Sequence, residues 1–328
     1  MRIAILDDYQ SSVSRLPCFE LLAGHEVKIF TNTARGVGQL AVRLAPFEAL
    51  VLNRDRTSLP RLLLAKLPNL RLIAQAGRVG PHIDVDAATR QGIAVADGVS
   101  DPTATAELTW TLIMAAMRRL SDYAGLLKEG LWQAASITPA RNGLGRSLKG
   151  RTLGIWGYGR IGSLVAGYGR AFGMQVVIWG SDASRQRAQA DGHAAAASRE
   201  AFFAGCDVVS LHLRLDDATL GIVGADDLAR MSPQSLLVNT SCAELIAPGA
   251  LLEALQRGRP GQAALDVFEN EPLAPTDPLL RLPNLLATPH IGHVEQDSYE
   301  QVYRAAFENV LNFARGEPTN LINPEILK

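Results

Sequence analysis

A glycine turn between an apolar segment and a helix constrains this chain more than any other feature. Residues 152–156 run directly into the turn, a helix is expected over 163–172, and another apolar strand follows at 175–179. The first glycine of such a turn permits a tight bend, the second lets the backbone approach a pyrophosphate, and the third lets helix and strand pack closely. The N–H groups of the helix N-terminus then face the phosphates. The pattern predicts a dinucleotide site formed by Gly157, Tyr158, Gly159, Arg160, Ile161 and Gly162.

Composition and charge exclude several other classes of protein. The chain has 328 residues, enough for two domains, and a net charge of −1 without a basic block, so no nucleic-acid partner is expected. Its three cysteines are widely spaced, which predicts neither a disulfide framework nor a metal site and favours a reducing cytoplasm. The sequence enters a strand at once, without a leader, and no apolar run approaches the ~20 residues of a membrane span. We therefore expect a cytoplasmic protein with no membrane partner.

The first hundred residues alternate short apolar runs with helical segments. Strands are expected at 3–6, 27–30, 49–52, 72–75 and 93–95, with the clearest helices at 59–67 and 84–91. This alternation is typical of a parallel, doubly wound sheet. Asp101 and Pro102 then mark a boundary, because Asp can cap a helix and Pro can occupy its first turn. The helix that follows is expected to reach about residue 120.

A second alternating unit follows an irregular segment. Residues 121–150 are rich in Gly, Ser and Arg and are interpreted as a projecting arm or a partner surface. Six strands are expected at 152–156, 175–179, 207–211, 235–238, 262–265 and 285–288. A helix with an apolar stripe from Tyr299 to Leu311 comes next and is expected to return to the first domain. The predicted fold is α/β, with two doubly wound parallel sheets. A Rossmann domain, 102–293, is inserted into a flavodoxin-like domain, 1–101 and 294–328.

Polar residues and glycines follow the predicted strands of the second unit. In an open α/β sheet the ligand lies beyond the carboxyl ends of the strands. Reading those positions in chain order gives Gly157, Gly180, His212, the segment 239–242 with Thr240, Asp266 and His290. Core packing explains such a series less well than a binding site does.

These residues carry a resemblance to a known family. The chain resembles the D-isomer-specific 2-hydroxyacid dehydrogenases, the family of D-3-phosphoglycerate dehydrogenase and glyoxylate/hydroxypyruvate reductase, over about residues 49–324. The matching segments are AGRVG at 76–80, IDVDAA at 83–88, AELT at 106–109, LKGRTLGI at 148–155, the GYGRIG turn, CDVVSLHL at 206–213, LVNTS at 237–241, ALDVFENEP at 264–272 and TPHIG at 288–292. Their combination is highly specific.

The resemblance implies roles for the residues at the strand ends. His290 would be the general acid/base for the substrate hydroxyl, and Glu271 would hydrogen-bond its imidazole and hold a proton there by charge attraction. Asp266 would contact the nicotinamide amide, with a loop-capping Asp as the alternative. His212 and Thr240 would line the cofactor-binding site, and His212 would take no part in proton transfer.

The resemblance also places the substrate carboxylate on the turn of the first domain. The backbone N–H groups of Gly77, Arg78, Val79 and Gly80 would bind it, unless this is a plain turn. Arg54 lies where members of the family can carry a substrate-side arginine. A solvated surface arginine is the alternative there.

Two departures from the family pattern bear on function. Where an acidic residue should hold the ribose of NAD, this chain has Gly180, then Ser181 and Asp182, with Arg185 and Arg187 nearby. Ser181 and either arginine could bind a 2′-phosphate, whereas Asp182 could reach the ribose. The sequence therefore favours NAD and keeps NADP as an alternative.

The second departure falls on the family's catalytic arginine, which clamps the substrate carboxylate and polarises the carbonyl. Cys242 stands in its place, and a thiol cannot form a bidentate ion pair. Arg78 or Arg214 could substitute for it. We expect an NAD(P)-dependent oxidoreductase acting on small D-2-hydroxy acids or 2-oxoacids and impaired by Cys242, without a C-terminal regulatory domain. A dinucleotide-binding sensor with little turnover is the alternative. A homodimer through residues 103–150 is implied by the resemblance.

Overall fold

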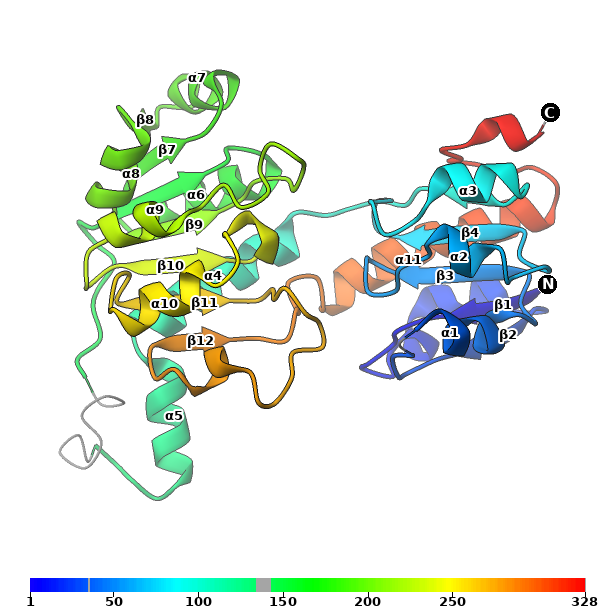
Figure 1. The fold of residues 1–328 in the computed structure, drawn as a ribbon, viewed down its shortest axis with the longest axis horizontal. Coiled ribbons are helices and arrows are strands. Elements are labelled where there is room, and N and C mark those ends of the chain that lie inside the picture. The colour runs from blue at the N-terminus through cyan, green and yellow to red at the C-terminus, as the bar shows by residue number, and fades with distance from the viewer. Residues whose placement is uncertain (35, 134–142, 328) are drawn as a thin grey trace. The chain divides into compact units, whose positions relative to one another are not determined.

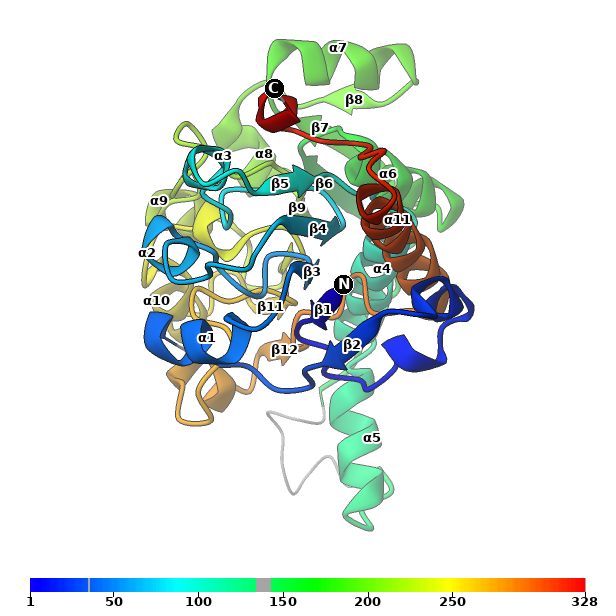
Figure 2. The same ribbon diagram turned by 90° about the vertical axis from the view of Figure 1, so that its right-hand side faces the viewer.

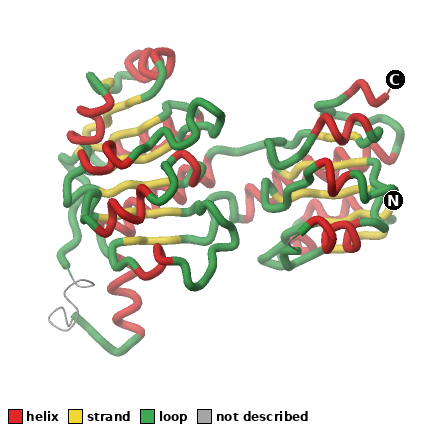
Figure 3. Tube along the Cα trace, in the orientation of Figure 1, coloured by secondary structure: helices red, strands yellow, loops and turns green. Residues whose placement is uncertain are grey.

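The computed structural model describes residues 1–34, 36–133 and 143–327. The chain divides into two compact units, one formed by Met1–Asp101 with Val294–Lys328 and the other by Pro102–His293. Each unit is a parallel sheet covered by helices (Figure 1 and Figure 3). The predicted class, two parallel α/β domains, is therefore confirmed.

Unit 1 has a five-stranded parallel sheet of order β2-β1-β3-β4-β5, the flavodoxin-like order. The strands are β1 (Arg2–Ile5), β2 (Glu26–Ile29), β3 (Ala49–Asn53), β4 (Leu72–Ala76) and β5 (Ala94–Ala96). Its helices are η1 (Val13–Arg15), η2 (Pro17–Leu22), α1 (Val37–Leu44), α2 (Arg61–Leu64), α3 (Val85–Arg90), α11 (Gln296–Ala314) and η5 (Pro324–Leu327).

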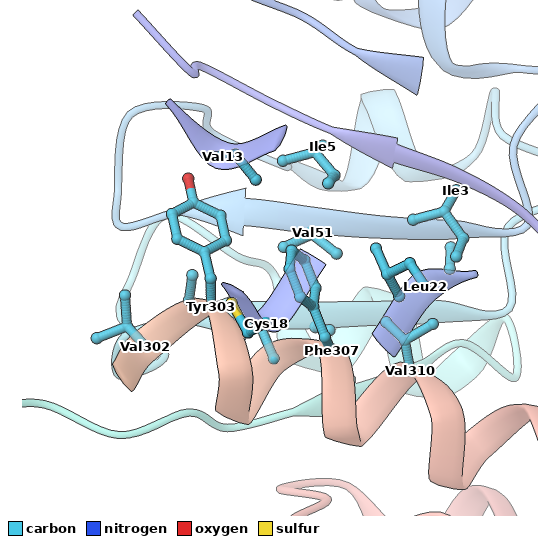
Figure 4. Packing of buried hydrophobic residues seen from close by; sticks show 14 of the residues in the cluster. Ile3, Ile5, Val13, Cys18, Leu22, Val51, Val302, Tyr303, Phe307 and Val310 are labelled. Atoms are coloured by element: carbon cyan, nitrogen blue, oxygen red, sulfur yellow. The ribbon is translucent and has the colours of Figure 1, made fainter. Parts of the chain in front are cut away.

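The side chains along each strand of unit 1 point alternately to the two faces of the sheet, so they contribute to two separate hydrophobic cores. Ile3 and Ile5 point to one face, where they join a cluster with Tyr303 and Phe307 of α11 (Figure 4). Ala4 and Leu6 point to the opposite face of the sheet, where α1, α2 and α3 pack. The predicted stripe on the C-terminal helix is thus buried on the sheet built by the first hundred residues.

Unit 2 has a seven-stranded parallel sheet of order β12-β11-β10-β9-β6-β7-β8. Its strands are β6 (Thr152–Trp156), β7 (Gln175–Trp179), β8 (Ala194–Ala195), β9 (Val208–Leu211), β10 (Leu236–Asn239), β11 (Gln262–Leu265) and β12 (Leu285–Ala287). Its helices are α4 (Thr103–Met117), α5 (Leu120–Lys128), α6 (Arg160–Ala171), α7 (Asp182–Ala190), α8 (Arg199–Gly205), α9 (Ala225–Arg230), η3 (Ala243–Leu245), α10 (Ala250–Gln256) and η4 (Pro278–Arg281).

Unit 2 differs from the sequence prediction in several details, and the bounds of β9, β10 and β12 are each shifted by one residue at one or both ends. The two-residue strand β8 is additional, and α6 begins at Arg160 rather than at residue 163. The segment 121–150 was expected to be irregular, but α5 occupies its first part and extends away from the sheet of its unit (Figure 1 and Figure 2). Residues 134–142 of that segment lie outside the described residues. Among the described residues no helix is long and apolar enough to cross a membrane.

Candidate active site

The three glycines of the predicted turn have three different surroundings. Gly157 has φ +101°, and a Cβ there would lie 2.5 Å from the carbonyl oxygen of His212. A Cβ on Gly162 would lie 2.1 Å from the carbonyl oxygen of Gly157, so both positions exclude a side chain. Gly159 has no atom within 4 Å of a built Cβ. The first and third glycines are therefore required by the fold, whereas the second leaves open space at the start of the helix.

Helix α6 presents its N-terminus beside that space. Its first intrahelical hydrogen bond runs from Ser163 N–H to Gly159 C=O at 3.0 Å, so the N–H groups of Arg160 and Ile161 precede it. Tyr158 behaves differently. Its N–H donates to Ser184 Oγ at 2.9 Å and its buried phenol donates to Asp191 at 2.8 Å. Tyr158 thus ties α7 to the turn, and its N–H is not a donor to phosphate in this structure.

The segment after β7 contains the residues considered for the ribose. Ser181 caps α7 by accepting Ser184 N–H at 3.3 Å, and Asp182 is paired with Arg185. The Arg185 guanidinium also lies 4.8 Å from the centroid of the Trp179 ring. Arg187 donates to the carbonyl oxygen of Tyr158 at 3.3 Å. Both arginines that could bind a 2′-phosphate already have partners within the unit.

His212 and Thr240 lie at the ends of neighbouring strands β9 and β10. Burial lowers the pKa of His212 to about 4, so the ring is neutral near pH 7, and its Nε2 lies 2.9 Å from Ser210 Oγ. A neutral ring with this pKa suits a wall of a binding site better than a proton donor. Thr240 is buried, and its hydroxyl lies 2.6 Å from the Thr109 hydroxyl of α4.

Cys242 ends a tight turn after β10. Asn239 closes this turn, because its Nδ2 donates to the carbonyl oxygen of Cys242 at 2.8 Å and its Oδ1 accepts Ser241 N–H at 3.0 Å. The Cys242 side chain is half-buried and packs against the apolar cluster that includes Leu245 and Ile246. The turn is well fixed, but position 242 offers no cationic group.

His290 and Glu271 form a close pair. His290 Nδ1 lies 2.6 Å from Glu271 Oε2, while Glu271 Oε1 accepts the N–H of Phe268 at 2.9 Å. The carboxylate is therefore held by the backbone at one oxygen and by the imidazole at the other. His290 has φ +52°, an unusual backbone conformation for a residue with a side chain, which occurs preferentially at functional sites. The pairing expected from the sequence is present in the geometry.

Asp266 fixes the loop that carries His290. It is buried at the end of β11, and its two carboxylate oxygens accept the N–H groups of Ile291 and Gly292, each at 2.8 Å, and the Thr288 hydroxyl at 2.6 Å. Burial raises the pKa of Asp266, and these hydrogen bonds oppose the rise. The resemblance assigned Asp266 to the nicotinamide amide, with a loop-capping Asp as the alternative, and its contacts in this structure are with the 288–292 loop.

In unit 1 the predicted carboxylate-binding turn follows β4. The N–H of Val79 is not available to a substrate, because it donates to Asp97 Oδ1 at 2.8 Å. Arg78 is exposed and forms an ion pair of 2.9 Å with the same carboxylate. Arg54 lies over Gly77, where a Cβ would be 2.8 Å from Arg54 Cδ. The sequence reasoning missed Asp97, although its place directly after β5 follows the same strand-end rule.

The fold and these residues are those of a dinucleotide-dependent dehydrogenase. Unit 2 has the strand order of a dinucleotide-binding sheet, a glycine turn that excludes side chains at 157 and 162, and a His–Glu pair at the carboxyl end of its strands. The open space at Gly159 beside the N-terminus of α6 fits a pyrophosphate. Among the described residues no group of three His, Cys, Asp or Glu side chains could hold a metal ion.

Comparisons with known proteins specify the family. Residues 110–292 match the model of the D-isomer specific 2-hydroxyacid dehydrogenase, NAD binding domain. A glyoxylate reductase of Aeropyrum pernix is 39% identical over 269 residues, 81% of this chain and 80% of that protein. The solved phosphoglycerate oxidoreductase of Vibrio cholerae O395 has a TM-score of 0.93 and 53% identity, covering 96% of this chain and 99% of that one. D-lactate dehydrogenase of Aquifex aeolicus, solved with NAD and lactic acid, has a TM-score of 0.77 and 28% identity, covering 98% and 99%.

This chain belongs to the D-isomer specific 2-hydroxyacid dehydrogenase family. It is an oxidoreductase that acts on CH–OH donors, and its cofactor is NAD. The family resemblance found in the sequence motifs is thereby confirmed.

Proposed function

We propose that the protein interconverts a small D-2-hydroxy acid and the corresponding 2-oxoacid, with His290 as the general acid/base. The observation that carries this proposal is the 2.6 Å contact between His290 Nδ1 and Glu271 Oε2. Asp266 holds the loop that carries His290 by accepting the N–H groups of Ile291 and Gly292. Bound NADH supplies the hydride. Because Glu271 accepts the proton on Nδ1, the other ring nitrogen, Nε2, is left to protonate the substrate oxygen during reduction.

The substrate and cofactor assignments are tested by one panel of assays. Glyoxylate, hydroxypyruvate, pyruvate and phenylpyruvate are each offered with NADH and with NADPH. We expect reduction with NADH, favoured over NADPH because Arg185 and Arg187 are engaged by Asp182 and by the Tyr158 carbonyl oxygen. Faster turnover with NADPH would contradict the proposed use of NAD, and no turnover on any of the four would favour a dinucleotide-binding sensor.

The cofactor site itself is tested at the middle glycine. Gly159→Ala should leave the fold intact, since a Cβ at 159 meets no protein atom within 4 Å, yet it should obstruct the pyrophosphate. We expect NADH binding, measured by calorimetry, to be lost or weakened at least about tenfold, with an unchanged circular dichroism spectrum. Gly167→Ala is the matched control, because Gly167 also has open space around a built Cβ and lies outside the turn. A folded Gly159→Ala variant with full affinity would rule out this site.

We further propose that the protein is a cytoplasmic homodimer that pairs through the region of α4 and α5. The support is a group of exposed apolar side chains there. Leu120, Leu127, Trp132 and Leu144 are 60%, 54%, 75% and 95% exposed. Such a concentration on one segment is typical of a protein interface. A solution mass of 35.2 kDa, that of one chain, would contradict the dimer. The cytoplasmic location is supported by the wide spacing of the three cysteines, which predicts no disulfide framework.

A further inference from the structure

Unit 2 contains a cavity at the carboxyl ends of its neighbouring strands β10 and β11. Its walls come from the last residues of these strands, from η3, from the start of α10 and from the segment 267–279. Most of the lining side chains are apolar, and Ile246, Leu251 and Leu265 among them are buried. The cavity has a volume of about 180 Å³. A cavity of about 150 Å³ with such walls is large enough to bind benzene.

The charged groups of this cavity are all acidic. Glu269 and Asp277 line it, whereas no Lys, Arg or His is among the described residues that do. Glu269 is exposed and Asp277 is half-buried, so both lie where the cavity meets solvent. One oxygen of Asp277 has a structural task, because Oδ1 accepts the N–H of Leu279 at 2.9 Å. A molecule with an apolar body and a cationic end matches this lining, since its body would leave water and its charge would meet two carboxylates.

Two residues that line the cavity also hold parts of the candidate active site. Phe268 borders the cavity, and its N–H donates to Glu271 Oε1 at 2.9 Å. Asn239 borders it too, and its side chain closes the turn of Cys242 by donating to the Cys242 carbonyl oxygen at 2.8 Å. A molecule bound in the cavity would therefore contact the residues that fix Glu271 and position 242.

We propose that this cavity is a regulatory site for a small apolar amine, and that a bound amine fixes Glu271 against His290 through Phe268. The regulatory part of the inference rests on the proposed function, whereas the binding part does not. Phe268 is half-buried, so a molecule in the cavity would add van der Waals contacts to it and restrict the segment 268–271. Because Glu271 takes its position from this segment, reduction should be faster when the cavity is filled.

Binding is tested with N,N-dimethylphenethylamine, a cation with a phenyl body whose tertiary nitrogen cannot condense with a 2-oxoacid. It is titrated by calorimetry into the enzyme saturated with NADH, so that the amine does not compete with the cofactor. We expect a Kd below about 1 mM, a modest affinity for a ligand of this size. The neutral 2-phenylethyl methyl ether should bind at least about threefold more weakly, because a partly exposed charge pair contributes a factor of this order.

Substitutions in the lining locate the bound amine. Leu252→Trp fills the cavity from a half-buried position on α10 and should abolish saturable amine binding. Ala247→Phe fills it from the segment after η3 and serves if Leu252→Trp does not fold. Glu269→Gln should lower the affinity for the amine and leave that for the ether unchanged. The matched control is Glu253→Gln, which removes an exposed carboxylate that pairs with Arg257 outside the cavity and should change neither affinity.

The regulatory effect is measured as kcat for glyoxylate reduction with and without saturating amine. We expect a rise of about two- to fivefold in the wild type, the scale of modest coupling between neighbouring sites. Glu271→Gln should still bind the amine but show no rise, because its side chain no longer stabilises the protonated imidazole. An unchanged kcat in the wild type at saturating amine would overturn the coupling.

The outcomes separate this inference from the proposed function. Amine binding that survives the cavity-filling substitutions, or equal affinity for the amine and the ether, would overturn the site. If the wild type reduces glyoxylate but does not bind the amine, the inference is wrong and the reductase proposal stands. If the amine binds in the cavity but no form turns over any 2-oxoacid, the reductase proposal is wrong and the amine site stands.

Discussion

Replacing Cys242 with arginine is expected to raise kcat for 2-oxoacid reduction by about 10²–10³-fold. An arginine here would place a charged donor near the alkoxide that develops during hydride transfer, and loss of one such donor typically costs that factor. The turn that would carry it is already built, with Asn239 holding the carbonyl oxygen of residue 242 at 2.8 Å. Steady-state kinetics with NADH and glyoxylate measure the change. The KM should also fall, because the same arginine would clamp the substrate carboxylate.

The matched control for this prediction is Cys242→Ser, which keeps the size of the side chain and adds no charge. It should leave kcat within about threefold of the wild type. A wild type that is already fast, with no gain from Cys242→Arg, would mean that another group polarises the carbonyl. Arg214, which is exposed, and Arg78 would then be replaced in turn. If both forms bind NADH and neither turns over, the sensor alternative is correct.

Replacing His290 with glutamine should lower kcat by about 10²–10⁴-fold, the usual contribution of a positioned general acid or base. Glutamine can still reach Glu271 with its amide but cannot transfer a proton near neutral pH. Calorimetry should show unchanged NADH affinity, since His290 lies outside the glycine turn. A loss of less than about fivefold would exclude His290 as the proton donor.

Glu271→Gln is a milder change at the same pair and has a different signature. The Glu271 charge stabilises the protonated imidazole, and protonated imidazole is the form that reduction requires. Removing the charge should therefore move the alkaline limb of the reduction profile to lower pH, while activity at low pH is less affected. One pKa unit corresponds to about 1.4 kcal/mol. If the profile keeps its position, Glu271 orients the ring without influencing its charge.

Strands were predictable from the sequence because buried parallel strands are continuous apolar runs between turn signals. Residues 152–156, 175–179 and 262–265 were placed with their observed bounds. Strand β8 was missed because two alanines carry no periodic pattern, and α5 because its Gly- and Arg-rich surroundings resemble a loop. The start of α6 was placed three residues late, since a glycine turn gives no sign of where helical dihedral angles begin.

The sequence predicted which residue types form the candidate site and at which strand ends they lie, but it did not predict all of their contacts. His290 and Glu271 lie together as the motif implied, whereas Asp266 holds the 288–292 loop and Tyr158 holds α7. Loop capping was the alternative named for Asp266, whereas the contacts of Tyr158 depend on tertiary geometry that no spacing rule encodes. The sequence also left Arg54 as either a surface residue or a substrate residue. In the structure the Arg54 side chain lies against Gly77 and its Nε is buried, so it is not a fully solvated surface arginine.

The position of α11 near the end of the sequence determines the order in which the two units can finish folding during synthesis. The strands of unit 1 lie within residues 2–96, but α11, residues 296–314, covers one face of their sheet. Unit 2 is continuous in sequence and contains its own cores, so it can fold as soon as it leaves the ribosome. The N-terminal strands, although made first, wait about 200 residues of translation for α11, and until then only η1 and η2 pack on that face of their sheet. The part of the chain that is made first therefore completes its core last.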